Sequence, residues 1–186
     1  MHGVVSTFDT ASDLKVRAIW HELNAQFGLT TLQEGLVPHV SWHVAEDYEL
    51  AGLMQQLAEI TEDIPAFDIH TNGLGVFTGK NLVLYLAIVK GAALAGLHRK
   101  IWRACESFAH GSSSFYTEQS WIPHITLAAD GLEQENLPEV LSSLAEREFT
   151  WKMRVETICV GRHELGQVGE LDCKFGLEGD SDENHP

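Results

Sequence analysis

Two stretches of the chain share one pattern, Pro38-His39-Val40-Ser41-Trp42 and Pro123-His124-Ile125-Thr126-Leu127. Successive side chains of a strand point to opposite faces. Each stretch therefore predicts a strand with an imidazole and a hydroxyl on one face, about 6–7 Å apart. The apolar residues of both stretches then face the packing on the other side.

The elements around the first stretch are predicted in the order strand, helix, strand, helix, strand pair. They cover residues 4–8, 12–27, 37–45, a helix from about Asp47, and 67–77. Gly28 is a suitable stop for the first helix. The dipeptide Asn72-Gly73 is favoured in tight turns and predicts the break between the last two strands.

The second half repeats this order. A nearly continuous apolar run at 82–89 predicts a central strand that is buried on both faces. A helix with its apolar face between Leu94 and Phe108, a strand at 122–128, and a helix capped by Asn136 follow, then strands at 149–160 and 169–177. We therefore predict one α+β domain over 1–177, with a repeat of roughly 1–80 and 81–177. It would form two pseudo-symmetric lobes, each an antiparallel-rich sheet with two helices, flanking a central cleft.

The charge balance argues against one class of partner. Lys and Arg number 12 against 27 for Asp and Glu, a formal net charge of −15. Tight binding to long nucleic acid relies on neutralising phosphates and needs a basic surface. We therefore expect a small phosphorylated ligand rather than long RNA or DNA. Residues 178–186 are rich in acidic residues and predict a disordered tail.

The rest of the composition favours a cytoplasmic protein that does not enter membranes. No apolar run approaches the roughly 18 residues of a membrane-spanning helix, and the start lacks a basic segment followed by an apolar stretch. The cysteines, Cys105, Cys159 and Cys173, are an odd number without zinc-ligand spacing. Cys159 and Cys173 fall on neighbouring predicted strands and could meet, but we expect buried free thiols in a reducing compartment.

The two motifs together suit phosphodiester chemistry. Histidine titrates near neutral pH, so one imidazole can accept a proton from a nucleophile while the other donates one to a leaving oxygen. Ser41 and Thr126 can hydrogen-bond the non-bridging oxygens and stabilise charge in the transition state. We therefore predict His39 and His124 as the catalytic pair, with no metal ion and no cofactor.

The paired motifs, their separation and the repeated strand–helix order resemble the 2H phosphoesterase superfamily. That group includes bacterial 2'-5' RNA ligases and RNA 2',3'-cyclic phosphodiesterases. Residues 67–89, with their Gly-Leu-Gly-Val-Phe stretch, resemble the middle region of the family. The resemblance implies that His39 and His124 are the acid–base pair and that Ser41 and Thr126 bind phosphate.

The activity implied by this resemblance is hydrolysis of the 2',3'-cyclic phosphate of a nucleotide or short RNA end to a 2'-phosphate. The reverse, 2'-5' ligation to a 5'-hydroxyl, uses the same groups and stays open. Two other classes also stay open: a nucleotide-binding module of the same fold with little turnover, and an interaction protein whose histidines are structural. Both motifs being intact favours the enzyme.

Five further residues are candidates for the site. Tyr116 and Trp121 precede the second motif and could stack on a base, although packing is the commoner role of such residues. His43 is predicted on the same strand face as Ser41, either at the edge of the cleft or supporting the residues that contact substrate. It would lie about 13 Å from His39, too far to share a metal ion. Lys152, with Arg154 on the same strand face, could contact phosphate, although surface charge is the default.

Overall fold

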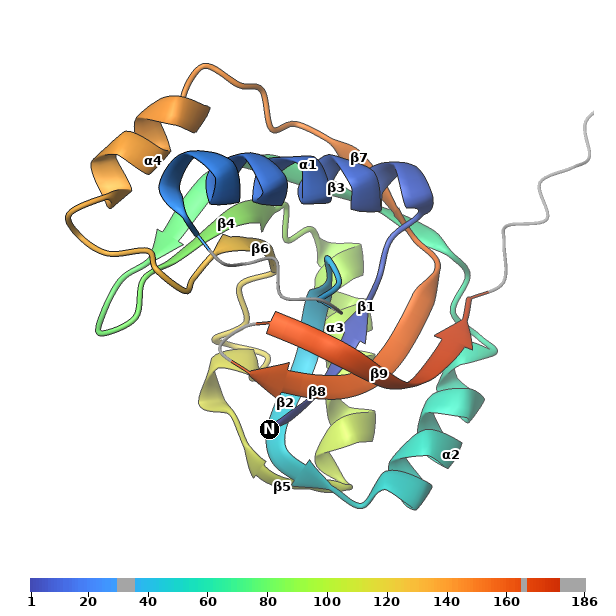
Figure 1. The fold of residues 1–186 in the computed structure, drawn as a ribbon. Helices are drawn as coiled ribbons and strands as arrows, with labels where there is room; N and C mark the ends of the chain where they lie inside the picture. The colour runs from blue at the N-terminus through green and yellow to red at the C-terminus, as the bar shows by residue number, and fades with distance from the viewer. Residues whose placement is uncertain (30–35, 165–166, 178–186) are drawn as a thin grey trace, which may run out of the picture.

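The chain folds into two antiparallel sheets that pack around one main hydrophobic core (Figure 1). The computed structural model describes residues 1–29, 36–164 and 167–177. The five-stranded sheet has the order β5 (Ala109–Ser112), β2 (Val40–Tyr48), β1 (His2–Ser6), β8 (Thr157–Glu164), β9 (Gln167–Gly176). The four-stranded sheet has the order β6 (His124–Ala128), β4 (Val83–Ile88), β3 (Phe67–Phe77), β7 (Lys152–Val155). Each sheet takes strands from both halves of the chain.

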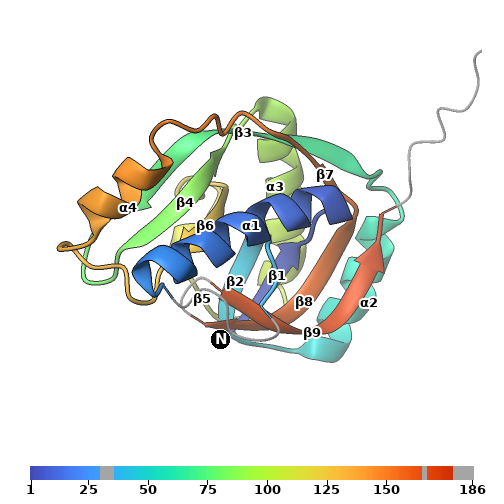
Figure 2. The ribbon, with the colours of Figure 1, turned by 45° about the horizontal axis from the view of Figure 1, so that its top comes forward.

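Two helices accompany each sheet. Helices α2 (Leu50–Thr61) and α3 (Ala92–Glu106) contact each other and pack on the five-stranded sheet. Helix α1 (Thr10–Phe27) contacts β6, and α4 (Leu137–Leu144) lies near β3 and β4 in both views (Figures 1 and 2). A short 3₁₀ helix, η1 (Ser114–Tyr116), precedes β6. The predicted fold class, α+β with two lobes each built on an antiparallel sheet and two helices, is confirmed.

Helix α1 shows how local sequence sets an element. The Asp9 carboxylate accepts the backbone N–H of Ser12 at 2.6 Å and caps the first turn. Gly28 ends the helix in the left-handed region, at φ 67°, and its N–H bonds the Asn24 carbonyl at 2.8 Å. Its apolar residues at helical spacing face the core: Val16, Ile19, Trp20 and Leu23 are buried, and Phe27 packs partly buried against them.

The prediction of a strand pair over 67–77 is wrong, because this segment is the single strand β3. Its pairing with β4 shifts between Thr71 and Leu74, where one additional residue is accommodated. Gly73 takes a positive φ of 81° at this point. The Asn72-Gly73 dipeptide thus forms a bulge inside a strand rather than a turn between two strands.

The predicted central position of β4 is confirmed, but the prediction that both of its faces are buried is wrong. Leu84, Leu86 and Ile88 are buried, whereas the alternate residues, such as Tyr85, are only partly buried. One face of β4 therefore packs in the core, and the other is left accessible beside β6.

Three further expectations concern the cysteines, the acidic tail and the membrane. Cys105 is a buried free thiol, as predicted, and Cys159 is buried, while the side chain of Cys173 lies outside the described residues. The acidic tail at 178–186 also lies outside the described residues and stays a prediction. Within the described ranges, none of the helices has the length and apolar character needed to cross a membrane.

Candidate active site

Both motifs stand at the beginning of a strand. Strand β2 begins directly after His39, and β6 begins at His124. Each motif lies in a different sheet, so each lobe contributes one imidazole and one hydroxyl. The apolar residues of both motifs are buried, as the alternation predicts: Val40, Trp42, Ile125 and Leu127.

The two motif histidines are held in the same way. His39 Nδ1 lies 2.9 Å from the carbonyl oxygen of Val37, and His124 Nδ1 lies 2.7 Å from that of Ile122. A carbonyl oxygen can only accept, so the hydrogen bonds assign the proton to Nδ1 in both rings. In the neutral ring the nitrogen that can accept a proton is then Nε2, which is the atom available for acid–base work.

Hydrogen bonds across the two lobes bring the motifs together. Trp121 Nε1 donates to the carbonyl oxygen of Ser41 at 2.8 Å, although Trp121 leads into β6 and Ser41 belongs to β2. The Tyr116 side chain also hydrogen-bonds the side chain of Ser41. Within the lobe of the four-stranded sheet, Trp20 Nε1 of α1 donates to the carbonyl oxygen of Thr126 at 3.0 Å. Strands β2 and β6 contact each other although they lie in different sheets.

Burial keeps both motif histidines neutral in the free protein. Burial lowers the pKa of His39 to about 4; the hydrogen bond to Val37 opposes this shift, and the charge of His124 adds to it. Burial likewise lowers the pKa of His124, against the bond to Ile122. Since His124 affects the pKa of His39, the two rings lie within electrostatic reach of each other. The hydroxyl residues beside them, Ser41 and Thr126, are each 5% exposed.

An aromatic pair lies against the His124 ring. The rings of Phe77 and Tyr85 are stacked with centroids 4.3 Å apart. Their centroids lie 4.9 and 5.3 Å from that of His124. Tyr85 pairs across the sheet with Thr126 on one side and Gly75 on the other. Sequence reasoning missed Tyr85 because it placed β4 wholly in the core; the available signal was the alternation Val83, Tyr85, Ala87. Phe77, the last residue of β3, was not identified as a site residue either.

Gly75→Ala tests this aromatic packing. A Cβ at Gly75 would lie 2.3–2.5 Å from atoms of the Tyr85 side chain, so the ring beside His124 must move. We expect the free energy of unfolding to fall by about 1–3 kcal/mol, and the ring NMR signals of His124 to shift. Gly96→Ala is the matched control, because its Cβ would meet nothing within 4 Å. Equal denaturation midpoints and unchanged His124 signals in both variants would contradict the packing described.

The structure gives different roles to the two aromatic residues predicted to contact substrate, Trp121 and Tyr116. Trp121 is 2% exposed and its ring lies between His98, at 3.9 Å, and Trp42, at 5.4 Å. Neither face is left for a base, so the prediction that Trp121 contacts substrate is corrected to a packing role. Tyr116 is partly buried, and its bond to Ser41 places it at the first motif.

His43 does not share a face with Ser41, which corrects the predicted position at the cleft edge. Ser41 pairs with Val5 and His43 with the adjacent Val4, so Trp42 is an additional residue in β2. Such a bulge reverses the alternation of side chains beyond it. His43 therefore turns towards α3 and is 0% exposed.

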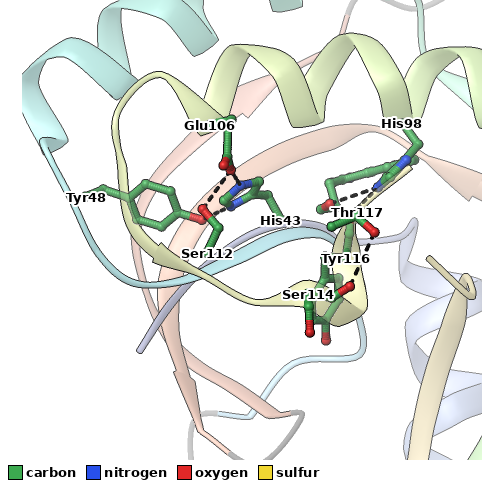
Figure 3. A network of polar contacts seen from close by, with 9 residues as sticks. His43, Tyr48, His98, Glu106, Ser112, Ser114, Tyr116 and Thr117 are labelled. Carbon is green, nitrogen blue, oxygen red and sulfur yellow. Dashed lines mark hydrogen bonds and ion pairs between the residues drawn. The ribbon is translucent and has the colours of Figure 1, made fainter. Parts of the chain in front are cut away.

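A buried polar network replaces the predicted role of His43 (Figure 3). Its Nδ1 lies 2.6 Å from the Tyr48 hydroxyl, and its Nε2 lies 2.9 Å from Glu106, which also accepts from Ser112 at 2.6 Å. Burial lowers the pKa of His43 despite the carboxylate, so a neutral ring bonds an ionised Glu106. This network joins α3 to β2 and β5 on the side away from Ser41.

The prediction for Lys152 and Arg154 also has a structural answer. Lys152 and Arg154 both pair with Asp68 of β3, at 2.9 and 3.6 Å, so both cations are engaged by one carboxylate on the four-stranded sheet. Among the described residues, no group of three or more His, Cys, Asp or Glu side chains is arranged to hold a metal ion.

Comparisons with known proteins agree with the fold and show the family. A family model described as the 2'-5' RNA ligase superfamily matches residues 10–167. A protein of Bacillus mycoides named "Putative phosphoesterase" is 25% identical over 122 residues, which are 64% of this chain and 66% of that protein. A Bacillus cereus protein of the same description matches to the same extent. The chain thus matches slightly less than two thirds of the length of these relatives.

Solved structures share the fold over nearly the whole chain. The Thermus thermophilus protein TT0787 superposes with a TM-score of 0.62 at 16% identity, covering 96% of this chain and 98% of that one. Escherichia coli LigT complexed with 3'-AMP gives a TM-score of 0.58 at 15% identity, covering 95% and 99%. At these identities the likeness is one of fold.

Proposed function

This chain belongs to the 2'-5' RNA ligase superfamily, the 2H phosphoesterases, and from that premise we propose that it is a metal-independent cyclic phosphodiesterase. Its substrate is the 2',3'-cyclic phosphate of a nucleotide or short RNA end, which it opens to a 2'-phosphate. His39 and His124 exchange the protons, and Ser41 and Thr126 bind the phosphate. Tyr116 contributes through its bond to Ser41.

One observation supports this assignment above the others. Both motif histidines donate Nδ1–H to the carbonyl two residues earlier, so both carry Nε2 as the proton-exchanging atom. A histidine that serves only packing has no need of the same backbone bond in two different sheets. The duplicated arrangement is the one that paired acid–base catalysis at a single phosphate requires.

The proposed step balances without another reactant. One neutral Nε2 accepts a proton from water as the water oxygen bonds to phosphorus. The bond from phosphorus to the 3' oxygen breaks, and that oxygen takes a proton from the Nε2–H of the other, protonated ring. The hydroxyls of Ser41 and Thr126 donate to the non-bridging oxygens as their charge grows. The products are a 2'-phosphate and a 3'-hydroxyl.

The ligand class rests on charge and on the family. The formal net charge of −15 disfavours tight binding along a nucleic-acid backbone. Crystal structures of E. coli LigT were solved with 3'-AMP, ATP and NADP+. We therefore propose a small nucleotide or an RNA terminus as the partner of this site.

A screen of purified protein tests the function. Nucleoside 2',3'-cyclic phosphates and 2'-5' oligoadenylates are incubated in excess EDTA, and the products are separated from their 3'-phosphate isomers. We expect turnover to nucleoside 2'-phosphates, since two imidazoles supply what a metal would. Loss of activity on chelation, restored by a divalent ion, would overturn the mechanism. A cyclic-phosphate end mixed with a 5'-hydroxyl oligonucleotide tests the reverse ligation.

The alternative is a nucleotide-binding module of the same fold. The LigT complexes with ATP and NADP+ favour it, because neither ligand carries a 2',3'-cyclic phosphate. Binding without turnover of any cyclic phosphate in the same screen would select this alternative.

The lowered pKa values predict where activity falls with pH. The base must be neutral, and its lowered pKa places the rising limb of kcat/KM below pH 6.5. The acid must be protonated, and its lowered pKa places the falling limb of kcat/KM below pH 6.5 as well. We therefore expect kcat/KM to be greatest below pH 6.5. The kcat profile should lie at higher pH, because a bound phosphate anion favours the imidazolium. A kcat/KM maximum above pH 7 would contradict the neutral histidines.

A further inference from the structure

His98 of α3 occupies a position that links the residues around the first motif. It is 1% exposed, and its ring stacks on that of Trp121 at 3.9 Å and an interplanar angle of 5°. Its Nε2 lies 3.2 Å from the carbonyl oxygen of Trp42 and 3.1 Å from that of Tyr116 (Figure 3). Both partners can only accept, so Nε2 carries a proton that the two carbonyls share.

The partners of His98 are the same residues that hold Ser41. Trp121, on which His98 stacks, donates from Nε1 to the Ser41 carbonyl at 2.8 Å. Tyr116, whose carbonyl accepts from His98, bonds the Ser41 side chain with its own side chain. Trp42, whose carbonyl also accepts, is the next residue after Ser41 in the chain. Three separate contacts of one imidazole thus converge on one serine.

We infer that His98 is a positioning residue, which fixes the Ser41 hydroxyl through Tyr116 and Trp121. This rests on the proposed function, in which Ser41 donates to a non-bridging phosphate oxygen. Either hydroxyl of this pair can donate, and when Tyr116 is the donor to Ser41 Oγ the serine proton is left for a non-bridging phosphate oxygen. A hydroxyl held in this way needs little reorganisation as charge develops in the transition state.

The chemistry of the position explains why it holds histidine. A phenylalanine could stack on Trp121, but it would leave the carbonyls of Trp42 and Tyr116 without their donor. A glutamine could supply the N–H but not the stacked ring. The ring also stays neutral, because burial lowers the pKa of His98 to about 4, and the nearby charge of Lys90 acts in the same direction.

His98→Phe and His98→Gln separate the hydrogen bond from the stacking. Each is measured for kcat and KM on a nucleoside 2',3'-cyclic phosphate, and for binding of adenosine 2'-phosphate, alone and with Ser41→Ala. We expect His98→Phe to lower kcat/KM about 10- to 100-fold when Ser41 is present. Combined with Ser41→Ala it should add little, since residues acting through one another are non-additive. His98→Gln should recover most of the loss, because it restores the donor.

His43→Phe is the matched control. His43 is another fully buried histidine of the same lobe, but its partners are Tyr48 and Glu106 rather than residues that hold Ser41. It should therefore change kcat/KM by the same factor in the wild-type protein and in the Ser41→Ala variant. Thermal unfolding of all variants separates loss of stability from loss of positioning.

The outcomes distinguish this inference from the proposed function. If His98→Phe lowers kcat/KM by the same factor in both backgrounds, as His43→Phe does, the positioning role is overturned and the enzyme assignment stands. If His98→Phe does not fold, the same cycle with His98→Leu, which also removes the donor to the carbonyls of Trp42 and Tyr116, decides the question. If the wild-type protein neither turns over cyclic phosphates nor binds adenosine 2'-phosphate, the proposed function fails, and the inference fails with it.

Discussion

Replacing His39 or His124 with Ala is expected to lower kcat on a 2',3'-cyclic phosphate about 100- to 10,000-fold, because each change removes one proton transfer. The double variant should be little worse than the worse single variant, since residues that act as a unit are not additive. The measurement is steady-state kinetics of the three variants on one substrate in EDTA.

His21→Ala serves as the control for these variants, because His21 is an exposed histidine on α1. It should turn over substrate at the wild-type rate. If either motif variant matched His21→Ala in kcat, that histidine would not be part of the reaction. The protein would then be better described as a nucleotide-binding module.

Removing a motif hydroxyl is expected to have the next largest effect. Ser41→Ala or Thr126→Ala deletes one hydrogen bond to the charge that develops on the phosphate, which costs about 100- to 1,000-fold in kcat when the donor is well placed. Thr126→Ser retains the hydroxyl and should stay close to wild type. The kinetics must show the loss mainly in kcat, because a bond made equally to substrate and transition state would change KM instead. A loss confined to KM would assign the hydroxyls to ground-state binding.

The motif strands could be predicted from sequence because their pattern is local. Alternation alone places Val40 and Trp42 in the core and puts His39 and Ser41 together on the opposite face of the strand. The same kind of local pattern predicted the inner face of α1 and its end at Gly28. Such predictions depend only on neighbours in the chain.

The errors arose where a strand departs from regular alternation. The bulge at Trp42 turned His43 away from Ser41, and the bulge near Gly73 joined two predicted strands into β3. A bulge is set by the pairing of two strands, so the sequence of one strand does not reveal it. The order of the strands in the two sheets is likewise a long-range property.

Other site residues were missed although the sequence carried a signal for them. His98 lies on the helical stripe that includes Ile101 and Cys105, both buried. A histidine on that stripe has to find buried partners, and here it finds two carbonyls. Tyr85 is not apparent from the sequence, because the apolar run at 82–89 predicts a strand that is buried on both faces.

The central claim is that two histidines exchange protons with one phosphodiester. The pH dependence of kcat/KM for the wild type, His39→Ala and His124→Ala, on one cyclic phosphate in EDTA, tests it most directly. We expect a bell-shaped profile for the wild type and the loss of one limb in each variant, a different limb in each. A flat wild-type profile, or two variants that retain both limbs, would contradict it.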